Sequence, residues 1–154
     1  MTVPWLLASL HLLALGIGLG AVWVRGRALR SRLDATGLRA VFQADAWWGF
    51  AAFLWISTGL WRVLAGVEKH TDYYLQNHLF LPKMALLAVI LALEVRPMIT
   101  LMAWRRVAGA GGQPVTTVAP TLARISFAQA GLVVLMVLLA TAMARGLGVL
   151  SQSH

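Results

Sequence analysis

Four long apolar stretches divide the chain, and polar residues separate each stretch from the next. They cover residues 5–24, 46–64, 79–100 and 125–144. Each is close to the roughly 20 residues that an α-helix needs to cross a hydrocarbon core of about 30 Å. The pattern therefore predicts an all-α fold, an integral membrane four-helix bundle that forms a single domain over residues 1–154.

The composition agrees with a membrane protein. Hydrophobic residues make up 60% of the chain and charged residues 12%, whereas a soluble domain is typically about 25% charged. The net charge of +8 would suggest nucleic acid in a soluble protein, but here the arginines lie between the apolar stretches and no groove-reading motif accompanies them. We expect the lipid bilayer as the partner and no nucleic acid. The chain has no cysteine, which excludes disulfides and thiolate chemistry.

The connections between the stretches predict the orientation. Residues 25–45 carry five arginines and residues 105–124 carry three. The connection in between has two acidic residues, Glu68 and Asp72, and one lysine, Lys69. Connections rich in arginine and lysine stay in the cytoplasm. The sequence thus predicts a multi-pass protein of the bacterial inner membrane with connections 25–45 and 105–124 cytoplasmic and both termini outside (N-out/C-out).

Small residues in the first stretch predict close helix packing. Gly16 and Gly20 form a GxxxG pair, and Ala14 and Gly18 form a second small-xxx-small pair. In lipid, small residues let helix backbones approach each other, and packing drives their association. The partner helix could belong to the same chain or to a second copy, so a homo-oligomer through the Gly16/Gly20 face is one prediction.

Several polar side chains are predicted to converge near the outer surface of the bundle. Helical geometry places His11 about 10 Å below that surface and Lys83 about 6 Å below it. Ionisable groups inside membrane spans usually face the bundle interior and mark a functional site. The predicted site has four central residues and four supporting ones: His11, Arg62, His78 and Lys83, with Asp45, Tyr74, Asn77 and Glu94.

Six of these residues also have a structural interpretation, and for His78 it is a position at the membrane interface. Lys83 and Arg62 are close enough to the interface to extend their charges into water. His11 could be a cofactor ligand or a packed, hydrogen-bonded histidine. Asp45 is expected to cap a helix that starts at residue 46. Glu94, in the inner half, could pair with an arginine or serve in proton transfer.

Three segments carry a resemblance to known families: "LHLLALG" around His11, "DAWWGFAAFLWISTGLWRV" after it, and "EKHTDYYLQNHLFLPKMALL" around Lys83. Together they resemble an uncharacterised bacterial family of four-helix predicted membrane proteins, a domain of unknown function. The pattern of His11 and Lys83 is also distantly similar to HemJ-type protoporphyrinogen oxidases and to copper-resistance D membrane domains. That similarity implies that His11 is the metal ligand of a haem b, with Lys83 on a propionate or in the second axial position.

Three functions stay open at this point. The first is a haem b-binding protein with a redox role, which would make it a haem-dependent oxidoreductase. The second is a transporter or ion-pathway subunit, which the ionisable groups in the spans favour. The third is a ligand-free structural or assembly protein that works through helix and lipid contacts.

Overall fold

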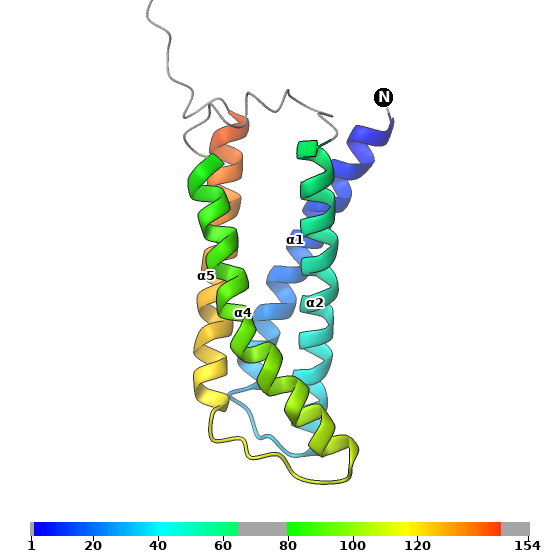
Figure 1. Ribbon diagram of the computed structural model, residues 1–154, viewed down its shortest axis with the longest axis vertical. Helices are drawn as coiled ribbons and strands as arrows, with labels where there is room; N and C mark the ends of the chain where they lie inside the picture. The colour runs from blue at the N-terminus through cyan, green and yellow to red at the C-terminus, as the bar shows by residue number, and fades with distance from the viewer. Residues whose placement is uncertain (1, 65–79, 146–154) are drawn as a thin grey trace, which may run out of the picture.

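The computed structural model describes residues 2–64 and 80–145, and these form four helices (Figure 1). The helices are α1 (Thr2–Ala28), α2 (Ala35–Leu64), α4 (Phe80–Gly109) and α5 (Ala119–Ala144). No strand occurs in the described part of the chain. The prediction of an all-α four-helix membrane bundle is confirmed.

The four helices run alternately up and down, so that four helix ends meet at each end of the bundle (Figure 1). The backbones of α1 and α2 pack closely, as do those of α1 and α5 and of α4 and α5. One end of the bundle gathers the C-terminal ends of α1 and α4 and the N-terminal ends of α2 and α5. This arrangement brings the two arginine-rich connections predicted from the sequence to the same end.

The helices are longer than the predicted spans. Residues 25–28 belong to α1 and residues 35–45 to α2, so the first predicted connection is mostly helical. Within the described residues, three helical segments are long and apolar enough to cross a membrane: Trp5–Ala28, Leu81–Gly109 and Ala119–Ala142. The predicted second span lies in α2, which is not among them, because four tryptophans and several polar residues lower its mean hydropathy.

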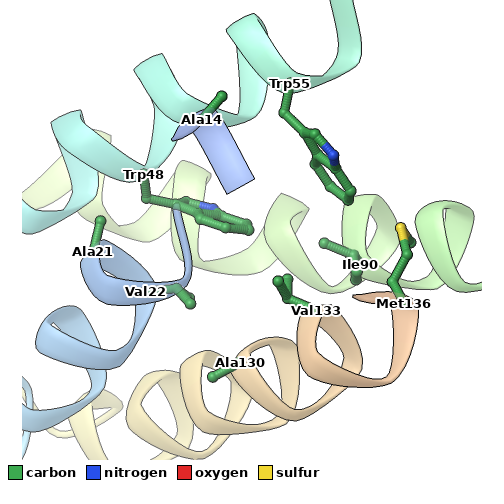
Figure 2. Close-up of a cluster of buried hydrophobic side chains, with 9 residues drawn as sticks. All are labelled: Ala14, Ala21, Val22, Trp48, Trp55, Ile90, Ala130, Val133 and Met136. Atoms are coloured by element: carbon green, nitrogen blue, oxygen red, sulfur yellow. The ribbon is translucent and has the colours of Figure 1, made fainter. Parts of the chain in front are cut away.

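Two apolar clusters fill the interior, one toward each end of the bundle. The first contains Trp48 and Trp55, which reach from α2 toward side chains of α4 and α5 such as Ile90 and Met136 (Figure 2). Large aromatic side chains bury much apolar surface, and these two fill the space where α2 does not pack directly on α4 or α5. The second cluster contains Leu29, Leu38, Val41, Leu101, Trp104, Ala119, Leu122 and Ala123.

The small residues of α1 point in two directions. Ala14 is buried, and a Cβ added to Gly18 would lie 3.4 Å from both Trp48 and Ala51 of α2. This pair therefore forms the close contact between α1 and α2. A Cβ on Gly16 or Gly20 would meet nothing within 4 Å, so the GxxxG pair faces outward and its role in an oligomer stays a prediction.

A tight turn joins α1 to α2 and fixes where α2 begins. The Asp34 carboxylate accepts hydrogen bonds from the backbone N–H groups of Thr36 (3.1 Å) and Gly37 (2.9 Å). Asp34 is thus the N-cap of α2, since its side chain satisfies two amides that have no partner within the helix. The prediction that Asp45 caps this helix was wrong, because α2 starts ten residues earlier at Ala35.

Proline 97 lies inside α4, and its side chain is buried. Proline removes one backbone hydrogen bond and clashes with the preceding turn, which bends a helix that continues past it. In Figure 1, α4 follows α5 in its first half and then crosses toward the beginning of α2. The bend brings the end of α4 within reach of polar groups on α2.

Candidate functional site

A buried arginine lies between the two apolar clusters and contacts all three other helices. The side chain of Arg25, on α1, is fully buried. Its Nη1 donates to Asp45 of α2 and to Glu94 of α4, each at 2.8 Å. Its Nη2 donates to Glu94 and to Gln129 of α5, also at 2.8 Å, and its Nε donates to Ser126 at 3.0 Å. A guanidinium has five N–H donors, so every one of them has an acceptor inside the protein.

The acceptors are themselves held in place by hydrogen bonds. The amide nitrogen of Gln129 donates to Glu94 Oε2 at 2.8 Å and to the backbone carbonyl of Ile90 at 3.2 Å. The Ser126 hydroxyl donates to the carbonyl of Leu122 at 3.0 Å, which leaves its oxygen free to accept from Arg25. A fully satisfied network of this kind is rigid, since each member fixes the rotamer of the next.

A second arginine completes the charge balance. The Nη2 of Arg105, near the end of α4, donates to Asp45 Oδ2 and to the carbonyl of Phe42, both at 2.8 Å. Asp45 therefore bridges Arg25 and Arg105 through its two oxygens. With Glu94, the group has two positive and two negative charges, so the buried cluster is neutral. We call these six residues the arginine network: Arg25, Asp45, Glu94, Arg105, Ser126 and Gln129.

The members of the arginine network differ in how far they are exposed. Arg25 is completely buried, the carboxylates of Asp45 and Glu94 are 12% and 19% exposed, and Arg105 is 38% exposed. The Trp48 ring also lies near Arg25, with its centroid 6.0 Å from the guanidinium carbon. Moving a charge out of water costs several kcal/mol per ion, and pairing with good hydrogen-bond geometry offsets this cost. The geometry of Arg25 meets that requirement.

His11 forms a separate polar cluster with two residues of α2. The indole N–H of Trp55 donates to His11 Nε2 at 3.1 Å. Because an indole nitrogen only donates, Nε2 must accept, and a neutral ring then carries its proton on Nδ1. The Nδ1 atom lies 2.9 Å from the hydroxyl oxygen of Thr58, whose own proton is used by the carbonyl of Leu54 at 2.7 Å. His11 is therefore a hydrogen-bonded histidine between α1 and α2.

The two polar clusters are far apart. His11 and Arg25 are 14 residues apart on α1, which corresponds to about 21 Å along the helix axis. The first apolar cluster, with Ala14, Val22 and Trp48, fills the space in between. Asp45 and Glu94, which were predicted from the sequence as supporting residues of the polar site, both contact Arg25 in the arginine network.

The remaining residues of the predicted outer site are only partly described. Lys83 lies in the first turn of α4 and is partly buried. Arg62 lies in α2, but its side chain is outside the described part, as are Tyr74, Asn77 and His78 altogether. Within residues 2–64 and 80–145, no group of three His, Asp or Glu side chains could hold a metal ion.

Sequence reasoning missed four members of the arginine network. Arg25 and Arg105 were counted as residues of cytoplasmic connections, whereas they lie in the last turns of α1 and α4. Ser126 and Gln129 were not singled out, although their spacing of three places them on one face of an otherwise apolar helix. Of the alternatives for Glu94, pairing with an arginine is confirmed.

The fold and the buried charges define an all-α integral membrane protein. The chain belongs to the family described as Predicted membrane protein (DUF2214), whose model matches residues 3–148. The predicted family membership is thus confirmed. No curated protein and no solved structure matches the chain, so the comparisons lend no support to the similarity to HemJ-type oxidases and copper-resistance D domains.

Proposed function

We propose that this protein is a structural membrane protein that acts through the surfaces it presents to lipid and to other membrane proteins. One observation carries the proposal: all five donors of the buried Arg25 are used by side chains of the three other helices. A buried cation with that many internal partners fixes the relative positions of the helices. Its role is to hold the bundle in one arrangement.

The arginine network supports a structural role better than an ion pathway. Its charges cancel, and its hydrogen bonds close on residues of the same chain. A path along the bundle would also have to pass the first apolar cluster, where Trp48 and Val22 are buried. An ion pathway needs groups that bind an ion and then release it. Buried groups whose hydrogen bonds are all made within the protein favour a fixed structure instead.

The His11 cluster favours the same conclusion. An imidazole nitrogen that binds iron must offer its lone pair, and the lone pair of His11 Nε2 accepts the hydrogen bond from Trp55 at 3.1 Å. Coordination through Nε2 would leave the buried Trp55 indole without this acceptor. His11 and its neighbours thus do not fit an axial haem ligand in this arrangement, and haem b stays a prediction from resemblance.

The distribution of arginine supports an orientation for the proposed protein. Five exposed arginines lie at the end of the bundle where α1 and α4 end and α2 begins: Arg27, Arg30, Arg32, Arg39 and Arg106. By the positive-inside rule, that end would face the cytoplasm of a bacterial cell, with both termini outside the inner membrane. Scanning accessibility of single cysteines introduced into this natively cysteine-free chain would test the orientation.

Absorption spectra test the proposal against a haem-binding role. We would purify the wild type and His11→Ala in detergent from cells supplied with a haem precursor, and record oxidised and dithionite-reduced spectra. The expected result is no Soret band in either protein and the same Tm for wild type from haem-depleted cells. A stoichiometric Soret band that His11→Ala removes would overturn the proposal.

Proteoliposomes test the proposal against an ion pathway. A potassium diffusion potential would be imposed with valinomycin, and proton entry followed with an internal pH dye. We expect the wild type to leak no faster than protein-free vesicles. A flux that the wild type supports and Glu94→Gln abolishes would overturn the structural role and make the arginine network part of a pathway.

A further inference from the structure

A surface groove lies between α1 and α5 at the arginine-rich end of the bundle. Its lining residues are Trp23, Arg27, Arg30, Ser31 and Phe127, and its volume is about 640 Å³. The arginine network does not contribute to it, since Arg25 points into the core and is buried. The groove is therefore a feature that the structural role leaves unexplained.

One wall of the groove is aromatic. The rings of Trp23 and Phe127 meet edge to face, with their centroids 5.0 Å apart. Phe127 packs on Gly26, where an added Cβ would come within 3.0 Å of the ring, so the ring is held firmly against α1. Trp23 is half exposed, and it presents an apolar surface to the bilayer.

The other wall is cationic. Arg27 and Arg30 are exposed, and the guanidinium carbon of Arg30 lies 5.1 Å from the centroid of the Phe127 ring. Within the described residues, no carboxylate lies at ion-pair distance from either arginine. The Ser31 hydroxyl donates to the carbonyl of Ala28 at 2.7 Å, so its proton is already in use. The two arginines thus supply the positive charge of the groove.

The depth of the groove matches the boundary of a bilayer. The apolar segment of α1 ends at Ala28, between the two arginines. Trp23 precedes that point by five residues, or about 7 Å along the axis, toward the membrane centre. The groove therefore runs from the headgroup level, where its charges lie, into the upper hydrocarbon, where its aromatic rings lie.

We propose that this groove binds an anionic phospholipid, with the phosphate on Arg27 and Arg30 and the start of an acyl chain against Trp23 and Phe127. Guanidinium groups bind phosphate oxygens in a paired geometry, and basic pockets beside membrane helices recognise anionic headgroups. The aromatic wall favours a lipid over free phosphate, because inorganic phosphate has nothing to place there. Two arginines without acidic neighbours favour an anionic headgroup over a zwitterionic one.

Native mass spectrometry of the full chain in detergent, titrated with phosphatidylglycerol or phosphatidylcholine, tests the proposal. An arginine near a membrane surface strengthens binding of anionic lipid by roughly five-fold, so two arginines give a preference of about 25-fold. We expect the wild type to prefer phosphatidylglycerol by that factor and Arg27→Gln/Arg30→Gln to lose the preference. Arg27→Lys/Arg30→Lys should retain most of it, because the charges stay.

The control is Arg39→Gln/Arg106→Gln, which removes two exposed arginines from the same end of the bundle but outside the groove. It should keep the preference, as should Ser31→Ala. Equal loss in the control, or a preference that survives Arg27→Gln/Arg30→Gln, would overturn the proposal. Displacement of the lipid by millimolar inorganic phosphate would also overturn it in favour of a phosphate site. Thermal unfolding of each variant shows whether it is folded.

Discussion

Arg25 and Glu94 meet through two parallel hydrogen bonds of 2.8 Å, Nη1 to Oε1 and Nη2 to Oε2. The two residues are 69 positions apart, on α1 and α4. These helices are not among the pairs whose backbones pack closely, so two long side chains join them across the interior. The bidentate geometry fixes both the distance and the orientation between the helices, because it satisfies the fork of the guanidinium and both carboxylate oxygens at once.

Replacement of Arg25 by glutamine should destabilise the bundle severely. The change leaves Asp45 and Glu94 without their shared cation, and breaking a buried ion pair from one side costs about 3–5 kcal/mol. Unfolding in detergent with increasing SDS, followed by circular dichroism, measures the loss of stability. Arg27→Gln is the matched control, since Arg27 is exposed two residues away on the same helix and should cost under about 0.5 kcal/mol. Equal stability of the two variants would show that the arginine network is not structural.

A double-mutant cycle should show that Arg25 and Glu94 act as one unit. Glu94→Gln alone leaves excess positive charge on Arg25, and Arg25→Gln alone leaves excess negative charge on Glu94. The double variant removes both charges, so its loss of stability should be smaller than the sum of the single losses by about 1–3 kcal/mol. The free energies of unfolding of all four proteins give the coupling directly. Additive losses would mean that the two charges do not depend on each other.

The two aspartates near the start of α2 should respond differently to the same substitution. Asp34→Asn keeps a side chain that caps helices well, so the change in stability should stay under about 0.5 kcal/mol. Asp45→Asn removes a charge that pairs with Arg25 and Arg105, and should cost about 3 kcal/mol or more. Both are measured by unfolding in detergent. A loss at Asp45 as small as the loss at Asp34 would show that the charge of Asp45 does not stabilise the fold.

The sequence predicted the class of fold because membrane spans follow from length and apolarity alone. Helix ends were less predictable: α1 continues to Ala28 through Arg25, although an arginine in a sequence normally indicates the end of a span. Two acidic residues could have indicated that an arginine is buried between the helices. Asp45 and Glu94 lie in or beside apolar stretches, and each requires a cation that only the tertiary fold can supply.

Which polar residues share a site depends on helix packing, which the sequence does not specify. His11 and Thr58 are 47 positions apart, and neither periodicity nor spacing indicates that they touch. Ser126 and Gln129 share one face of α5. Their spacing does not show whether that face is turned into the bundle or toward another chain. The predicted outer site grouped residues by depth alone, and depth does not determine which way a side chain points.

Leucine substitutions should separate the inward and outward small-residue pairs of α1. Gly18→Leu places a large side chain against Trp48 and Ala51, and overpacking of this kind costs about 1–3 kcal/mol. In Gly16→Leu, the new side chain extends into open space beside the bundle, where it contacts lipid. The stability of the monomer should therefore not fall. Unfolding in detergent gives the stabilities, and sedimentation in the same detergent gives the oligomeric state. If the wild type is a dimer that Gly16→Leu and Gly20→Leu disrupt, and Gly18→Leu only destabilises the fold, then the outward pair contacts a second copy of the chain. If every variant and the wild type are monomers, the outward pair contacts only lipid.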